Sequence, residues 1–167
     1  MDFRVEQVID ADPDAVARAY ADPALYQAIG AAGGLGRPEV VDRQVEGDLV
    51  RLQVRYRFTG ELSSAAQAVL DPQRLTWVEH SEHDLARRHV SYRLVPDHYG
   101  DRFRAAGECR IAPGAPPGDG AVRAVTGSVK VRALVVGPAV ERAIVSGLRD
   151  HLTGEVAAVE RFLARAG

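Results

Sequence analysis

The chain has 167 residues, 46% of them hydrophobic and 26% charged, as is ordinary for a globular domain. Its formal net charge of −2 excludes a global positive field that would attract nucleic acid or an anionic membrane. The single cysteine, Cys109, excludes an intramolecular disulfide and any metal site built from several cysteines.

We expect a single domain over residues 1–167, because this length buries roughly 70% of the unfolded surface. The chain begins with a charged, alternating segment, and no window approaches about 18 consecutive apolar residues. A cytoplasmic protein without a membrane span is therefore predicted.

The N-terminal part predicts one strand and two short helices. Residues 3–9 alternate between apolar and polar, which is typical of a strand. Asp12 and Asp22 each supply an N-cap carboxylate and are each followed by proline, which suits the first position of a helix. The helices should end near Tyr20 and Ile29.

The middle of the chain predicts antiparallel strands. A glycine-rich turn over residues 30–36 leads into a strand over residues 39–46. The clearest strand follows, because Val50, Leu52, Val54, Tyr56 and Phe58 face one way while arginine and glutamine face the other. Further strands are expected at about residues 75–83, 88–95, 103–111 and 121–131, and a short helix could form within residues 63–70.

One long amphipathic helix is predicted over residues 138–165, about 40 Å in length. Such a helix is longer than a small sheet needs to cover one face. The predicted fold is therefore α+β: a curved, seven-stranded antiparallel sheet, two short N-terminal helices, and a long C-terminal helix over a cavity. The apolar stripe of this helix consists of Val140, Ile144, Leu148, Leu152, Val156, Val159 and Leu163.

Local patterns give this arrangement a specific resemblance. They are Asp22-Pro23 in the helix pair, Trp77 after a short helix, and Gly127-Ser128-Val129-Lys130-Val131 leading through Val136-Gly137 into Val140-Glu141. On these patterns the chain resembles the START/Bet v 1-like (SRPBCC, helix-grip) superfamily from end to end, and within it a family of uncharacterised proteins from high-GC bacteria. The resemblance implies a deep, largely apolar cavity. Relatives use this cavity for lipids, sterols, polyketides or hormones, and some catalyse cyclisation or dehydration there.

On the long helix, His151 and Glu155 lie in or beside the apolar stripe and are four residues apart, so their side chains can meet. A carboxylate on an apolar wall would have a raised pKa and could act as an acid or base with His151 as its partner. Alternatively, Glu155 pairs with an arginine at the rim of the sheet and His151 lies at the edge of the stripe.

In the sheet, Trp77 and Glu79 share one face of their strand. If Trp77 points inward, Glu79 does too, close to Tyr56 and Tyr92. This group could hydrogen-bond a ligand in a dry pocket, or the tyrosines could fill the core with their hydroxyls on backbone carbonyls. Gln7 is a weaker candidate of the same kind. The candidate ligand-binding residues are Tyr56, Phe58, Trp77, Glu79, Tyr92, Phe103, Leu148, His151, Leu152 and Glu155.

No metal or cofactor is expected. His80 and His83 are three residues apart on a strand and therefore face opposite sides. The glycine-rich segment 30–36 lacks the Lys-Ser/Thr ending of a phosphate loop.

Outward arginines should form a solvated face interleaved with Glu46, Glu61 and Glu108, or contact an anionic partner; they are Arg51, Arg55, Arg57, Arg93, Arg102, Arg104 and Arg110.

Three functions fit these patterns. The main hypothesis is binding or carriage of a hydrophobic small molecule, lipid-like or polyketide-like, by a monomer or homodimer that binds no nucleic acid. The second is a cyclase or dehydratase that uses Glu79 or the His151–Glu155 pair. The third is a regulatory protein-interaction module with a vestigial pocket. We favour a binding protein over an enzyme.

Overall fold

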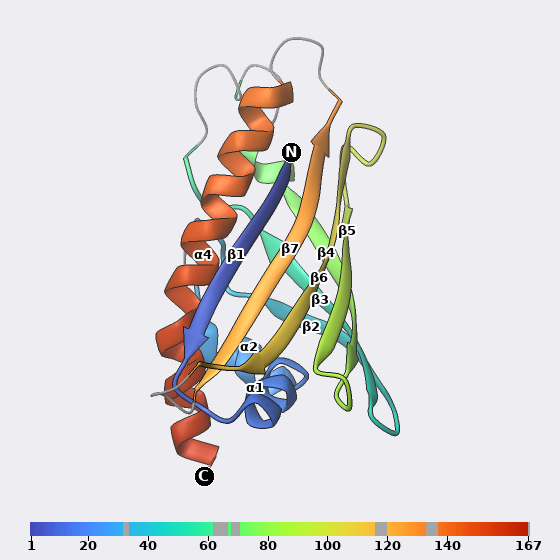
Figure 1. The fold of residues 1–167 in the computed structure, drawn as a ribbon. Coiled ribbons are helices and arrows are strands. Elements are labelled where there is room, and N and C mark those ends of the chain that lie inside the picture. The colour runs from blue at the N-terminus through green and yellow to red at the C-terminus, as the bar shows by residue number, and fades with distance from the viewer. Residues whose placement is uncertain (32–33, 62–66, 68–70, 116–119, 133–136, 167) are drawn as a thin grey trace.

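The computed structural model describes residues 1–31, 34–61, 67, 71–115, 120–132 and 137–166. Its strands form one antiparallel sheet of seven, in the order β1-β7-β6-β5-β4-β3-β2 (Figure 1). The helices lie on one side of this sheet, so the predicted α+β helix-grip architecture is confirmed. The strands are β1 (Asp2–Ile9), β2 (Glu39–Glu46), β3 (Leu49–Arg57), β4 (Thr76–Asp84), β5 (His89–Pro96), β6 (Phe103–Pro113) and β7 (Ala121–Val131); the helices are α1 (Pro13–Tyr20), α2 (Pro23–Ile29), the 3₁₀ helix η1 (Pro72–Arg74) and α4 (Gly137–Ala166).

Both predicted helix starts are confirmed by their hydrogen bonds. The Asp12 carboxylate accepts from the Ala15 amide at 2.9 Å, and the Asp22 carboxylate accepts from the Ala24 amide at 2.9 Å. Each bond satisfies a backbone donor that the first turn of a helix leaves without a partner. The short helix expected within residues 63–70 lies outside the described residues, apart from Gln67.

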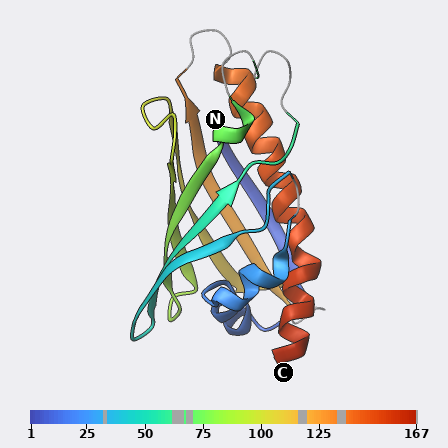
Figure 2. The same ribbon diagram turned by 180° about the vertical axis from the view of Figure 1, so that it is seen from behind.

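The helices cover the inner face of the sheet unevenly. The long helix α4 packs mainly against β1, β7, α1 and α2. Figure 2 shows α1 and α2 together at one end of the sheet, close to the C-terminal part of α4. We call this the closed end, and the end near the start of α4 the upper end. At the closed end Ile9, Val16 and Leu25 are completely buried.

Two glycines let the strands β6 and β7 pass beneath an aromatic ring. Gly107 and Gly127 are cross-strand partners, and Tyr92 of β5 is the partner of Gly107 on the other side. A Cβ atom on Gly107 would lie 2.0 Å from the Thr126 carbonyl oxygen and 2.5 Å from the Tyr92 hydroxyl. Only glycine fits this close approach.

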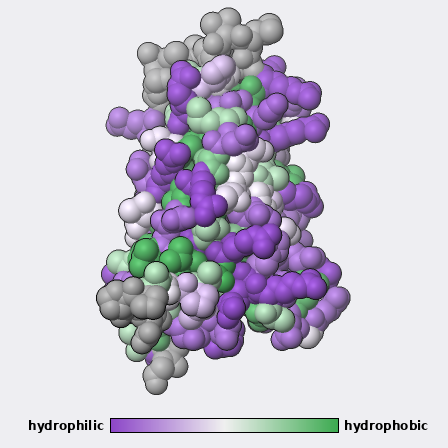
Figure 3. All heavy atoms as spheres, in the orientation of Figure 1, coloured by the Kyte–Doolittle hydropathy of each residue, from purple (hydrophilic) through white to green (hydrophobic). Residues whose placement is uncertain are grey.

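The outer face of the sheet is polar. Hydrophilic residues dominate the face of the molecule shown in Figure 3, and hydrophobic residues gather there in smaller patches. No helix among the described residues is both long enough and apolar enough to cross a membrane.

Candidate functional site

The strand β4 points Trp77, Glu79, Ser81 and His83 toward the helices. Ser81 and His83 are buried, whereas Glu82 between them is exposed. Since side chains alternate along a strand, the odd-numbered residues of β4 point inward. Trp77 therefore faces inward, and Glu79 does too. His80 has the outward parity, so the two histidines face opposite sides as predicted. No group of three potential metal ligands occurs within the described part of the chain.

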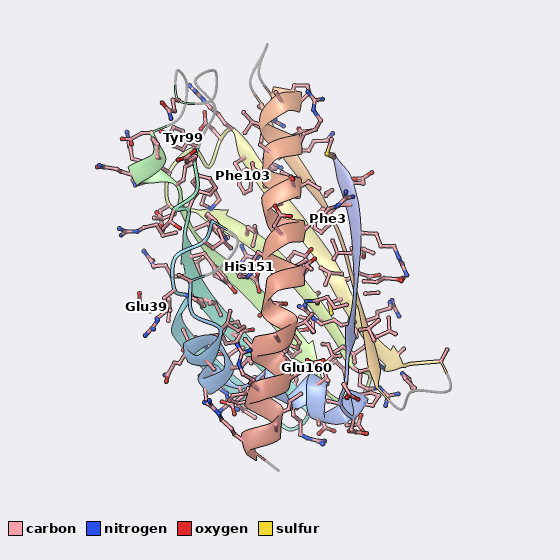
Figure 4. All side chains as sticks on the ribbon, turned by 90° about the vertical axis from the view of Figure 1, so that its left-hand side faces the viewer. Phe3, Glu39, Tyr99, Phe103, His151 and Glu160 are labelled. Atoms are coloured by element: carbon pink, nitrogen blue, oxygen red, sulfur yellow. The ribbon has the colours of Figure 1, made fainter. Side chains whose placement is uncertain are left out.

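An aromatic contact joins the sheet to the middle of α4. Tyr56 of β3 stacks on Trp77, its cross-strand partner, with ring centroids 5.9 Å apart and an interplanar angle of 16°. The His151 ring of α4 meets Tyr56 edge-on, with centroids 6.4 Å apart. Figure 4 shows His151 near the middle of the helix. At this level, therefore, α4 reaches across to β3.

Near this contact the inner face is incompletely covered. Four residues of the sheet point toward the helices, as their buried neighbours do, but are only partly buried: Trp77, Glu79, Leu94 and Phe103. Leu148 of α4 packs against the core and is also only partly buried. Figure 4 places Phe103 beside the upper part of α4. Each of these side chains therefore keeps some surface that solvent can reach. The buried apolar cluster contains Ile9, Val16 and Leu25 at the closed end and extends to Phe3 and Val129 toward the upper end.

Glu79 is the most unusual polar group among these partly buried side chains. Its cross-strand partners are Val54 and Leu94, and no described residue donates a hydrogen bond to its carboxyl. Burial raises the pKa of Glu79 from the ordinary 4.5 to about 7. Burial, followed by the Glu79 charge, also raises the pKa of Tyr56 and of Tyr92, which indicates that the three groups are close together.

The two tyrosines differ in how their hydroxyls are used. The Tyr92 hydroxyl donates to the Thr126 carbonyl at 3.1 Å, as the core-filling alternative predicted. The Tyr56 hydroxyl makes no hydrogen bond to any described residue. Glu79 and Tyr56 are therefore the polar groups of this cluster that have hydrogen-bonding capacity left for a ligand.

Glu79→Gln is expected to change how stability depends on pH. A carboxyl whose pKa is raised in the folded state contributes stability that is complete below the unfolded pKa and is lost as the pH rises through the folded pKa. Urea unfolding should therefore show wild-type stability falling relative to E79Q between about pH 4.5 and pH 7. Glu82→Gln, on the exposed face of the same strand, is the control. Parallel stability curves for wild type and E79Q would contradict the desolvation of Glu79.

A buried ionic cluster lies between β1, β7, α1 and α4. Glu155 accepts hydrogen bonds from Arg123 at 2.9 Å, Tyr20 at 2.9 Å and Gln7 at 3.0 Å. Gln7 also accepts from Arg123 and donates to the Leu152 carbonyl. The Arg123 guanidinium lies 3.8 Å from the centroid of the Tyr20 ring, a cation–π contact.

This cluster shows which contacts of the two interpretations the helix residues make. His151 Nε2 lies 3.6 Å from Glu155 Oε2, so the two side chains meet as their spacing predicted. Glu155 nevertheless pairs with an arginine, as the second interpretation expected. That arginine, Arg123, is inside the protein on β7 and not at the rim of the sheet: its side chain is 13% exposed and that of Glu155 is 6%.

Sequence reasoning missed Arg123 and Tyr20. The signal for Arg123 was present, because it shares the parity of Ala121, Val125 and Val129, which are buried on the inner face of β7. Tyr20 is the last residue of α1, on the same buried side as Val16.

The remaining predicted residues occupy the periphery of the site. Leu152 is buried, and its backbone carbonyl belongs to the ionic cluster. Phe58 follows the end of β3, and its ring lies over Gly60, so that a Cβ there would be 2.8 Å from the ring.

A second polar pair, Ser81 and His83, lies deeper in the sheet. The Ser81 hydroxyl is 3.0 Å from His83 Nε2, and burial lowers the pKa of His83 to about 4, which keeps it neutral. The residues are only 5% and 4% exposed. A substrate could not reach this pair without displacing the core.

Comparison with known proteins identifies the family of this chain. Residues 4–163 match the family described as Protein of unknown function (DUF2505). None of the curated proteins matches the sequence.

Several solved structures are similar over nearly the whole chain. The Thermus thermophilus protein TTHA0849 is 18% identical with a TM-score of 0.70, covering 100% of this chain and 99% of its own. The ZhuI aromatase/cyclase from Streptomyces sp. R1128 is 16% identical with a TM-score of 0.66, covering 99% and 94%. Norcoclaurine synthase from Thalictrum flavum is 16% identical with a TM-score of 0.65, covering 98% and 86%. At this level of identity the similarity shows a shared Bet v 1-like fold.

Proposed function

This chain belongs to the DUF2505 family of proteins of unknown function, and we propose that it binds a hydrophobic small molecule between α4 and the upper half of its sheet. The observation that carries the proposal is the environment of Glu79. Its raised pKa reflects desolvation by the protein, yet its side chain keeps accessible surface and receives no hydrogen bond from a described residue. A polar group of this kind suits a ligand that completes its hydrogen bonding.

The chemistry of the surrounding side chains indicates the class of ligand. Trp77, Leu94, Phe103 and Leu148 present apolar surface, which favours a largely apolar molecule. Near neutral pH a substantial fraction of Glu79 is protonated and can donate a hydrogen bond, which favours a carbonyl or hydroxyl on that molecule. A lipid-like or polyketide-like compound has both properties.

An enzyme is the second candidate, and the acid–base state of Glu79 favours it. A carboxyl with a pKa of about 7 can give and take a proton at neutral pH. Similar folds include an aromatase/cyclase and norcoclaurine synthase. In an enzyme, Glu79→Gln should abolish turnover and leave affinity nearly unchanged. In a carrier the same substitution should alter affinity alone.

Native mass spectrometry of freshly purified protein tests the binding proposal. We expect an excess mass equal to one small organic molecule, which disappears when the same sample is denatured. Protein stripped by organic extraction and refolded should regain an excess mass from a lipid extract. A native mass equal to that of the polypeptide in both experiments, with a tight protein partner recovered instead, would favour the interaction-module hypothesis.

A further inference from the structure

The outer face of the sheet, opposite α4, carries a groove of about 540 Å³ across β5, β6 and β7. Arg93, Ala106 and Ser128 follow one another across these strands in register. Ala106 and Ser128 are small, so they form a low floor between longer side chains. A volume of this size is in the range that small-molecule sites occupy.

The groove is strongly basic. Of its basic side chains, Arg102 alone has a carboxylate of a described residue within ion-pair distance, the Asp101 side chain at 3.8 Å. The other basic side chains of the groove form no ion pair with any described residue. Five basic and one acidic residue line it: Arg93, Arg102, Arg104, Lys130, Arg132 and Asp101.

Of the four outward arginines beyond the groove, three are paired with carboxylates, and Arg57 forms no ion pair with a described residue. Arg51 pairs with Glu46 and Glu82, Arg55 pairs with Asp97, and Arg110 pairs with Glu108. The predicted interleaving of arginines with carboxylates therefore holds for Arg51, Arg55 and Arg110 and fails at the groove. The positive charge of the groove is local, because the chain as a whole carries −2.

The arrangement of the basic residues has a cost to the fold. Arg104 and Lys130 are direct cross-strand partners, and the Arg132 amide donates to the Arg102 carbonyl at 2.7 Å, which places a second like-charged pair beside the first. Like charges directly opposite each other destabilise a sheet. A bound anion would turn this repulsion into attraction.

We propose that the groove binds a soluble small molecule that carries phosphate groups. Guanidinium and ammonium groups converging from adjacent strands match the several oxygens of a phosphate chain. An extended polyanion such as RNA fits less well, since the neighbouring groove, which shares Arg93, also contains Asp42 and Glu82. The site is independent of the hydrophobic ligand, which we place on the opposite face of the sheet.

Isothermal titration calorimetry with sodium pyrophosphate tests this inference. Wild type should bind one pyrophosphate saturably, and Arg104→Gln with Lys130→Gln should weaken the affinity about tenfold or more. Arg57→Gln with Arg149→Gln removes the same charge from exposed positions outside the groove and should leave the affinity within about twofold. Circular dichroism should show that both double variants are folded, and the groove variant should have the higher melting temperature because its repulsion is gone.

Three outcomes would overturn the proposal. They are no saturable binding of pyrophosphate, an equal loss of affinity in the groove variant and its control, and binding of phosphatidate vesicles or RNA that pyrophosphate does not displace. The groove variant should still bind a hydrophobic probe normally, so this test and the test of the interior site fail or succeed separately.

Discussion

Replacing Arg123 by methionine should lower the free energy of unfolding by about 3–5 kcal/mol. The substitution removes the cation that pairs with Glu155 at 2.9 Å and leaves a carboxylate that is 6% exposed without its charged partner. A buried ion is tolerated only when a charged partner and hydrogen bonds compensate for its lost hydration. Removing one residue of the pair therefore lowers the free energy of unfolding by far more than the intact pair contributes to it. Chemical denaturation of the two proteins would measure the difference.

A double substitution and an exposed pair provide the controls for Arg123. Arg123→Met combined with Glu155→Gln removes both charges while the glutamine can still accept from Tyr20, so it should recover a large part of the loss. Arg4→Met breaks the exposed Arg4–Glu6 pair and should cost less than about 1 kcal/mol. If R123M were as stable as R4M, the cluster would not be the structural support that we infer.

Gly107→Ala should destabilise the fold by about 3 kcal/mol or more. Its new methyl group would lie 2.0 Å from the Thr126 carbonyl oxygen and 2.7 Å from the Gly127 Cα, and neither backbone atom can move without disturbing the ladder between β6 and β7. The Tyr92 ring would also have to leave its place above the glycines. Thermal or urea unfolding would show the loss, together with a change in near-ultraviolet circular dichroism from Tyr92.

The same substitution in α4 should act in the opposite direction. A Cβ on Gly147 meets no described atom within 4 Å, so Gly147→Ala should gain up to about 1 kcal/mol from helix propensity alone. A Gly107→Ala variant as stable as Gly147→Ala would show that β6 and β7 can separate, which would contradict the close approach of the strands.

Most of the fold was predictable because its signals are local. Asp-Pro pairs mark the starts of α1 and α2, and strict alternation marks β3. The four-residue spacing of apolar residues marks α4. The close approach of the sheet to an aromatic ring at Gly107 and Gly127 was not predicted, because it depends on Tyr92 from a third strand.

The site was predictable only in part, since it is defined by pairs that are distant in sequence. Parity placed Glu79 beside Trp77, and helical spacing placed His151 beside Glu155. Neither rule could reveal that Arg123, from a strand 32 residues away, would engage Glu155. That contact compensates the buried charge of Glu155, whereas Glu79 receives no hydrogen bond from a described residue.

Trp77 provides the most direct test of the account, because it is the only tryptophan and borders the proposed binding space. Titration with the neutral probe N-phenyl-1-naphthylamine should quench Trp77 emission saturably in wild type. Leu148→Phe, which adds volume beside the space, should weaken this quenching. Leu163→Phe, about 22 Å along the same helix toward the closed end, should leave it unchanged. Unaltered Trp77 emission, or equal behaviour of the two variants, would show that no hydrophobic molecule enters between α4 and the upper sheet.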